Sequence, residues 1–198
     1  VLDNKKISEK LLIEILNNKK IKVYCNFSID KDNIEEIKDR YDLIINCTYN
    51  NPFLGLTKQQ ISIKHEKCLI PILSDNKFSN IGITIMDGPF CSIYPCPNKN
   101  FTLSSVVYTP YSKEKENNYL DLKNNVNKII NHGRSFFNFS EELKIAGYYL
   151  GTKTKIKNDK NDERDSFVIR EGKVISVFSG KVSAALTAYK KVKSEIEK

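Results

Sequence analysis

Several features common in proteins are missing from this 198-residue sequence. No apolar run approaches the roughly 20 residues that a membrane-spanning helix needs, so we expect no membrane segment. The chain does not open with the pattern of a signal peptide, and no two of its five cysteines form a CxxC pair. Cysteines placed in this way are typical of reduced, packed thiols. We therefore expect a cytoplasmic protein without a metal site.

Arginine is also scarce, since only four of the 32 basic residues are arginines. A net charge of +8 would suit a nucleic-acid partner. However, proteins that bind phosphates and bases favour arginine, because its guanidinium group is planar. Here the positive charge comes mainly from lysines spread along the chain. We therefore expect no nucleic-acid partner, and a basic nucleic-acid-binding protein is kept as a third hypothesis only.

The first quarter of the chain predicts alternating helices and strands. The chain begins at Val1 and is in a helical pattern within a few residues, as a fragment or a processed product would be. Residues 8–16 place four apolar side chains on one helix face, and residues 20–27 alternate like a strand. Residues 32–39 predict a helical turn. The apolar run 41–47 suits a parallel strand that is buried on both faces and ends at a ligand crevice.

The middle of the chain has a different character. Residues 60–73, 81–86, 90–94 and 103–109 are β-rich runs separated by turn signals. Consecutive strands with short connections favour an antiparallel sheet. A helix over residues 119–131 and a return strand over 144–156 complete this part.

The last part predicts two short strands, a glycine turn and a helix. Residues 165–170 and 173–178 form the strands on either side of Gly172, and the turn Ser179-Gly180-Lys181 leads into an alanine-rich helix over residues 182–193. A strand followed by a glycine turn and a helix N-terminus is a geometry that binds anions and dipoles.

Three stretches of the sequence resemble a known family. They are residues 41–48 (YDLIINCT), residues 81–90 (IGITIMDGPF) and residues 164–182, which end in SVFSGKV. Together and in this order they resemble the flavoprotein superfamily that includes D-amino-acid oxidase, sarcosine oxidase and 2-hydroxyglutarate dehydrogenase. The resemblance implies an α+β fold. Residues 1–57 and 156–198 would belong to a flavin domain, and residues 58–155 would form an antiparallel substrate-domain sheet with its helix.

The resemblance also implies FAD as the cofactor and a set of contacts. The backbone N–H groups of residues 181–183 would face the flavin, with the cofactor contacts at Thr48, Ser179, Gly180, Lys181 and Val182. Substrate contacts would come from Tyr94 and Tyr108 on the sheet and from Arg164 and Arg170, whose guanidinium groups suit a carboxylate. Two alternatives remain open. Gly180 could be an ordinary turn residue, and the two arginines could be surface residues beside acidic neighbours. No catalytic residue is singled out.

Two departures from the family pattern bear on the cofactor. The GxGxxG turn that holds the pyrophosphate is absent from the sequence, and Tyr49 stands where the family has a glycine. We therefore expect that this chain alone binds FAD weakly or not at all and is inactive. A nucleotide-binding segment N-terminal to Val1 is the expected partner, besides a small-molecule substrate.

The sequence thus leads to two main hypotheses. The first is an FAD-dependent oxidoreductase acting on a small amine, amino acid or hydroxy acid, here without its GxGxxG half. The alternative is a non-catalytic module that has retained the substrate-domain sheet for binding a partner or a polysaccharide, and the missing glycine turn is its support.

Overall fold

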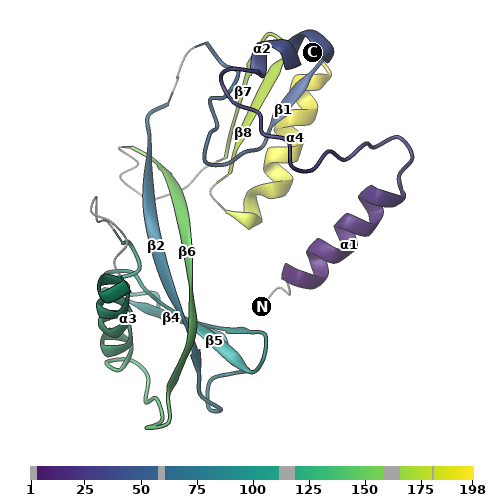
Figure 1. Cartoon of the computed structure of the whole chain (residues 1–198). Coiled ribbons are helices and arrows are strands. Elements are labelled where there is room, and N and C mark those ends of the chain that lie inside the picture. The colour runs from purple at the N-terminus through teal and green to yellow at the C-terminus, as the bar shows by residue number, and fades with distance from the viewer. Residues whose placement is uncertain (1–3, 58–60, 112–118, 158–165, 180) are drawn as a thin grey trace.

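The computed structural model describes residues 4–57, 61–111, 119–157, 166–179 and 181–198. Its elements follow the sequence pattern closely (Figure 1). In chain order they are α1 (Asn4–Asn17), α2 (Ile34–Arg40), β1 (Ile44–Asn46), β2 (Ile63–Ser74), β3 (Ile83–Thr84), β4 (Cys91–Cys96), β5 (Asn100–Ser105), α3 (Tyr119–Gly133), β6 (Lys144–Ile156), β7 (Phe167–Glu171), β8 (Val174–Phe178), the 3-10 turn η1 (Val182–Ala184) and α4 (Ala185–Ile196).

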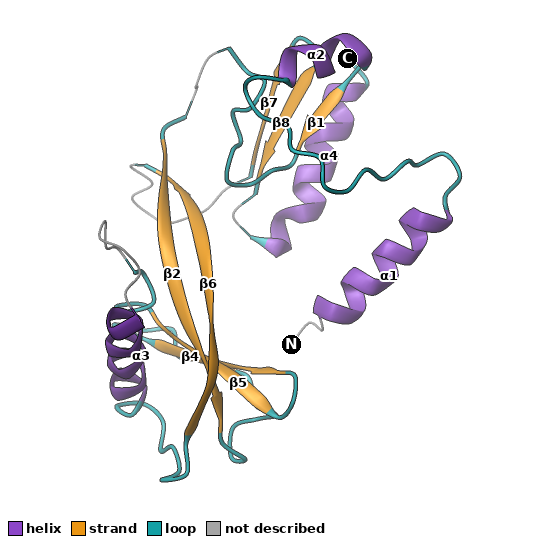
Figure 2. Ribbon diagram, viewed as in Figure 1, coloured by secondary structure: helices purple, strands orange, loops and turns teal. Residues whose placement is uncertain are grey.

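The strands form two sheets, which Figure 2 shows one above the other. The smaller sheet has the order β1-β8-β7, with β1 parallel to β8 and β7 antiparallel to it. The larger sheet has the order β3-β4-β5-β2-β6 and is antiparallel throughout. Helices and a largely antiparallel pair of sheets confirm the expected α+β class.

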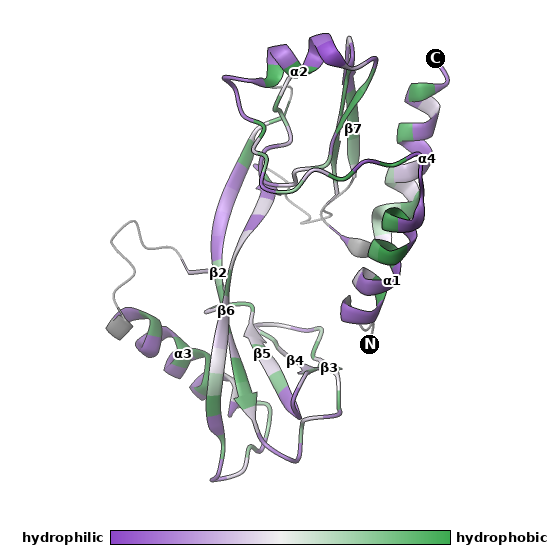
Figure 3. Cartoon of the chain, turned by 45° about the vertical axis from the view of Figure 1, so that its right-hand side comes forward, coloured by the Kyte–Doolittle hydropathy of each residue, from purple (hydrophilic) through white to green (hydrophobic). Residues whose placement is uncertain are grey.

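The larger sheet buries one face under α3. Alternate strand residues such as Leu69, Leu73, Phe101 and Leu103 point into this core, where they meet apolar side chains of α3 including Ile129. The residues between them, among them Thr102, point to the opposite face. In two views α3 and α4 lie on opposite sides of strands β2 and β6 (Figures 1 and 3).

The smaller sheet joins the two ends of the chain. Ile44 of β1 pairs with Val174 of β8, so strands from residues 1–57 and 156–198, which the resemblance assigns to one flavin domain, meet in one sheet. Ile34 of α2 is buried and packs beside Gly55, whose φ is +82°. A Cβ on Gly55 would lie 3.2 Å from atoms of both Ile34 and Val174, so this loop approaches the sheet closely.

Two expectations for the N-terminal part are wrong. Residues 20–27 form no strand; they are a turn and an extended loop. A strand needs a neighbour for its backbone N–H and C=O groups, and no described strand offers one here. The run 41–47 does yield the parallel strand β1, but this strand is not buried on both faces, because Ile45 is 45% exposed. On this face α4 packs against β7 and β8, and Ile45 lies in the open groove between β1 and α4.

Helix α1 stands apart from the rest of the molecule. The pattern at residues 8–16 predicted this helix, which extends from Asn4 to Asn17. Its apolar face, which Figure 3 shows in green, is exposed, including Leu11, Leu12 and Leu16. Among the described helices, none combines the length and the apolar character that would let it cross a bilayer.

Candidate functional site

An open groove of about 690 Å³ lies where the two parallel strands end. Strands β1 and β8 run in the same direction, so their carboxyl ends meet at one edge of the sheet, and α4 lies beside them. Most of the lining is apolar, and its polar groups come from the loops that follow the two strands and from Tyr189 of α4. The lining residues are Ile45, Cys47, Tyr49, Val177, Ser179, Lys181, Ala185, Ala188, Tyr189 and Val192.

The loop after β1 is held by Asn46. The buried Nδ2 group of Asn46 donates to the carbonyl oxygen of Asn51 at 3.0 Å and lies 3.3 Å from that of Leu54. Its Oδ1 atom accepts the N–H of Thr48 at 3.0 Å and lies 2.8 Å from the Thr48 hydroxyl. Ser176, the residue paired with Asn46 on β8, donates its hydroxyl to the Pro52 carbonyl. This buried network fixes the rim of the groove.

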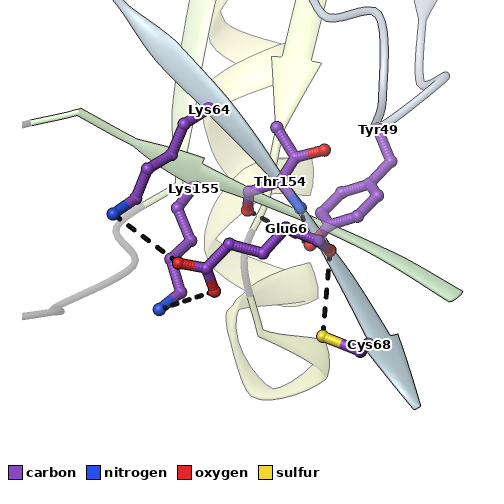
Figure 4. A network of polar contacts seen from close by, with 6 residues as sticks. All are labelled: Tyr49, Lys64, Glu66, Cys68, Thr154 and Lys155. Atoms are coloured by element: carbon purple, nitrogen blue, oxygen red, sulfur yellow. Dashed lines mark hydrogen bonds and ion pairs between the residues drawn. The ribbon is translucent and has the colours of Figure 1, made fainter. Parts of the chain in front are cut away.

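Tyr49 takes the glycine-like conformation that its position requires. Its φ is +47°, in the left-handed region that non-glycine residues seldom adopt. Its ring stacks on buried Phe178 at a centroid distance of 5.6 Å. Its hydroxyl accepts the N–H of Thr154 at 3.2 Å and donates to the Thr154 carbonyl at 3.3 Å, as Figure 4 shows. These contacts offset the backbone strain, which typically amounts to about 1–3 kcal/mol.

The turn after β8 is held by Ser179. Its hydroxyl accepts a hydrogen bond from Ser166 and donates to the Lys181 carbonyl, both at 3.0 Å. The chain then forms η1 and continues as α4, whose N-cap residue Ala184 supplies no side-chain oxygen to the first helical N–H groups. Uncapped N–H groups give this end of α4 the partial positive charge that favours negative groups nearby.

Cys47 supplies a thiol to the groove. Burial raises the pKa of Cys47 above its ordinary value, so the thiol form predominates near neutral pH. All five cysteines are free. The described residues contain no cluster of three or more His, Cys, Asp or Glu side chains that could hold a metal ion.

The structure brings four of the five expected cofactor contacts to this edge of the sheet. Ser179 and Lys181 line the groove, and Val182 begins η1 directly after them. Thr48 lies in the loop after β1, where its hydroxyl is 2.9 Å from the Asn51 carbonyl. Gly180 lies outside the described residues. Three residues of this site, namely Asn46, Cys47 and Tyr189, were not identified from the sequence. Asn46 could have been found, because it stands at a strand end, where a polar side chain often organises the following loop.

The expected substrate contacts do not meet in one place. Tyr94 of β4 pairs with Thr102, faces away from α3, and contacts the Thr84 hydroxyl. Tyr108 instead packs edge-on against His132 of α3 at 5.5 Å. The guanidinium of Arg170 donates to the Glu195 carbonyl near the end of α4, and Arg164 lies outside the described residues.

A polar network joins the beginning of β2 to the end of β6 (Figure 4). Glu66 pairs with Lys155 at 3.0 Å and with Lys64 at 3.6 Å. The hydroxyl of buried Thr154 donates to Asn50 Oδ1 at 2.8 Å and lies 3.0 Å from His65 Nδ1. Since Asn50 and Tyr49 belong to the loop after β1, this network ties the groove to the long strands of the larger sheet.

Comparison with known proteins gives two similarities. No family model matches the sequence. The chain is 31% identical over 127 residues to the FAD-dependent monooxygenase FPY4 of Fusarium mangiferae, which covers 58% of this chain. It spans only 34% of the length of that relative. Its structure is similar to that of an FAD-dependent oxidoreductase from Pseudomonas aeruginosa, with a TM-score of 0.46 and 7% identity over 70% of this chain and 39% of the other.

Proposed function

We propose that this chain is part of an FAD-dependent oxidoreductase that acts on a small amine, amino acid or hydroxy acid. The observation that carries the proposal is the groove at the carboxyl ends of β1 and β8. Sheets with parallel strands bind dinucleotides at such edges, with a helix N-terminus close by. The Fusarium protein that this chain resembles is described as FAD-dependent.

The groove fits the ring end of the cofactor better than its nucleotide end. Apolar walls from Ile45, Val177 and Ala185 suit a flat ring, and the turn at 179–182 would supply Ser179, Gly180, Lys181 and Val182, with Thr48 opposite. When bound, FAD would supply the electron-accepting chemistry, and the residues of this chain would orient it and exclude water. The sequence offers no GxGxxG turn for the pyrophosphate, so a segment N-terminal to Val1 is the proposed partner.

The proposal assigns a part to each region of the chain. Residues 1–57 and 156–198 would form the flavin side, and residues 58–155 the substrate side. Tyr94 is the substrate contact that we favour, because it lies on the sheet face away from α3. Two other candidates have structural contacts instead. Tyr108 packs against His132, and Arg170 bonds the backbone of α4 at Glu195. The five free thiols favour a reducing compartment, and we propose the cytoplasm.

A flavin titration of the 198-residue chain tests the proposal. We expect the purified chain to be colourless, because the main contacts to the pyrophosphate are missing. Flavin mononucleotide should bind weakly, and FAD should bind no more tightly, because this chain does not hold the adenylate. Both flavins should slow the alkylation of Cys47. Tight, stoichiometric FAD would show that the nucleotide end is held here after all, and no flavin binding would exclude the groove as the ring site.

Two neighbouring substitutions in α4 provide a matched control. Ala185 lines the groove and Leu186 does not. Ala185→Phe should therefore fill the groove and abolish flavin binding, while Leu186→Phe should leave it unchanged.

The missing glycine turn favours a second candidate, a non-catalytic module that binds a partner or a polysaccharide through the larger sheet. The same titration separates the two candidates, because only the flavin proposal expects protection of Cys47.

A further inference from the structure

Strand β6 is a long edge strand with an uncharged, exposed centre. In the described part of the chain this strand of 13 residues pairs with β2 alone, through 12 residue pairs. Between Lys144 and Lys153 it carries no charge, and Tyr149 and Leu150 are 52% and 50% exposed. The opposite edge of the same sheet is β3, which has only two residues. Natural sheets protect their edges with short strands, charges, prolines or bulges. Strand β6 has a register shift at Ala146, and its centre from Gly147 to Thr152 has none of these devices.

From this edge we propose that β6 is a self-association surface and that its partner is β6 of a second copy of this chain. The two strands would run antiparallel about a twofold axis and join the two larger sheets into one. An interface of this kind uses the same patch on both copies, and the unpaired backbone groups in the centre of one strand meet their complements on the other. The Tyr49 hydroxyl already bonds both backbone groups of Thr154, so the pairing lies on the Lys144 side of Thr154.

The sequence of β6 determines the register. A twofold axis perpendicular to the sheet keeps each side chain on its own face, and paired residues must share a face. The axis must therefore pass midway between the two copies of one residue. Leu150 is the midpoint of Lys144–Ile156, and an axis between its two copies pairs residues 147–153, a segment that ends before the register shift at Ala146 and before Thr154. Tyr149 then faces Gly151 of the second copy, where the space is open because a Cβ on Gly151 would have no atom within 4 Å. An aromatic side chain packed over a cross-strand glycine is a favourable pair.

The charges agree with this register. Lys153 faces Gly147 of the second copy, and Lys144 and Lys155 lie outside the paired segment, so no lysine stands opposite another. Like charges directly opposite each other would be destabilising. Tyr148 faces Thr152, and the two copies of Leu150 meet at the axis. The centre of the strand, residues 147–153, is thus complementary to itself.

Sedimentation of the full 198-residue chain tests the proposal over about 1 to 200 µM, because association follows mass action. We expect a concentration-dependent dimer. Leu150→Lys places two charges at the axis and should abolish the dimer at every concentration, with an unchanged circular dichroism spectrum. Leu186→Lys, an exposed leucine on α4, should leave the dimer intact. A monomeric parent chain, or a dimer that survives Leu150→Lys, overturns the proposal.

Hydrogen exchange on the unsubstituted chain provides an independent measurement. Alternate amides of β6 should gain protection as the concentration rises, and the amides of β5, which is an interior strand, should not change. The exposed helix α1 is the rival surface. If Leu11→Lys dissociates the dimer and Leu150→Lys does not, the copies associate through α1 and β6 is not the interface.

Discussion

At the residue scale, one buried carboxylate connects the stability of the larger sheet to pH. Asp75 follows β2, and its two oxygens accept the N–H of Lys77 at 2.9 Å and the N–H of Ser140 at 2.7 Å. Burial by itself would raise the pKa of Asp75, but these N–H donors outweigh it and hold the pKa below its ordinary value. The bonds join the end of β2 to the loop before β6.

We predict that Asp75→Asn destabilises the fold by about 1.5–3 kcal/mol near neutral pH, the range for hydrogen bonds to a charged group. Because the folded pKa is lowered, the carboxylate stabilises above the unfolded pKa, and this contribution disappears as the pH falls through the folded pKa. The difference between parent and variant should therefore shrink in denaturant unfolding from about pH 7 to about pH 2. Asp87→Asn, in an exposed turn, is the control and should differ little from the parent. A pH-independent difference would contradict the assigned role.

Sequence reasoning succeeds at some residues and fails at others for a physical reason. Tyr49 was identified as standing in a glycine position, and its φ of +47° agrees. Asn46 was missed, because its importance depends on carbonyl groups up to eight residues away in a loop whose path the sequence does not predict. Local patterns indicate backbone conformation, whereas the partners of a buried amide follow only from the folded chain.

At the element scale, the two glycines that flank β8 should respond differently to a larger side chain. Gly172 has a φ of +56° in the turn between β7 and β8, so Gly172→Val should mainly destabilise, by about 1–3 kcal/mol. Gly180, which lies outside the described residues, is predicted to bring backbone N–H groups to the flavin. In the protein complete with its nucleotide-binding segment, Gly180→Val should slow flavin reduction about a hundredfold with a smaller effect on stability.

Reduction rate and melting temperature, measured on both variants, distinguish the two glycines. If Gly180→Val reduces flavin at the parent rate, Gly180 is only a turn and the assignment of the 179–182 turn to the cofactor fails.

The elements themselves were largely predictable, and the exception is informative. Strand β6 occupies the residues that the sequence indicated, a run rich in the isoleucine, tyrosine and threonine residues that favour strands. Residues 20–27 alternate between apolar and polar residues and form no strand. An alternating pattern of apolar and polar residues indicates that a segment can form a strand, but the strand also requires a neighbouring strand to pair with. Strand order and the exposed edge of β6 likewise depend on the assembled sheet.

At the scale of the whole molecule, α1 contributes little to stability. Its described side chains are all exposed, so removing residues 1–17 should change the melting temperature by less than about 2 °C. Removing α4 from residue 185 onward is the contrasting deletion. It uncovers the sheet beneath buried Ala188 and should lower the melting temperature by far more. A large loss of stability on removing α1 would show that its apolar face is covered in solution.

The Tyr49 hydroxyl makes the groove and the larger sheet a thermodynamically linked pair. It is bonded to both backbone groups of Thr154, and its ring forms part of the groove wall. A ligand that displaces the ring must break both bonds, so its affinity is reduced by the free energy that they contribute. By reciprocity, anything that holds β6 in place strengthens the wall of the groove by the same amount. The affinity of the groove for a ligand and the order of β6 are therefore thermodynamically coupled through the two Tyr49 bonds.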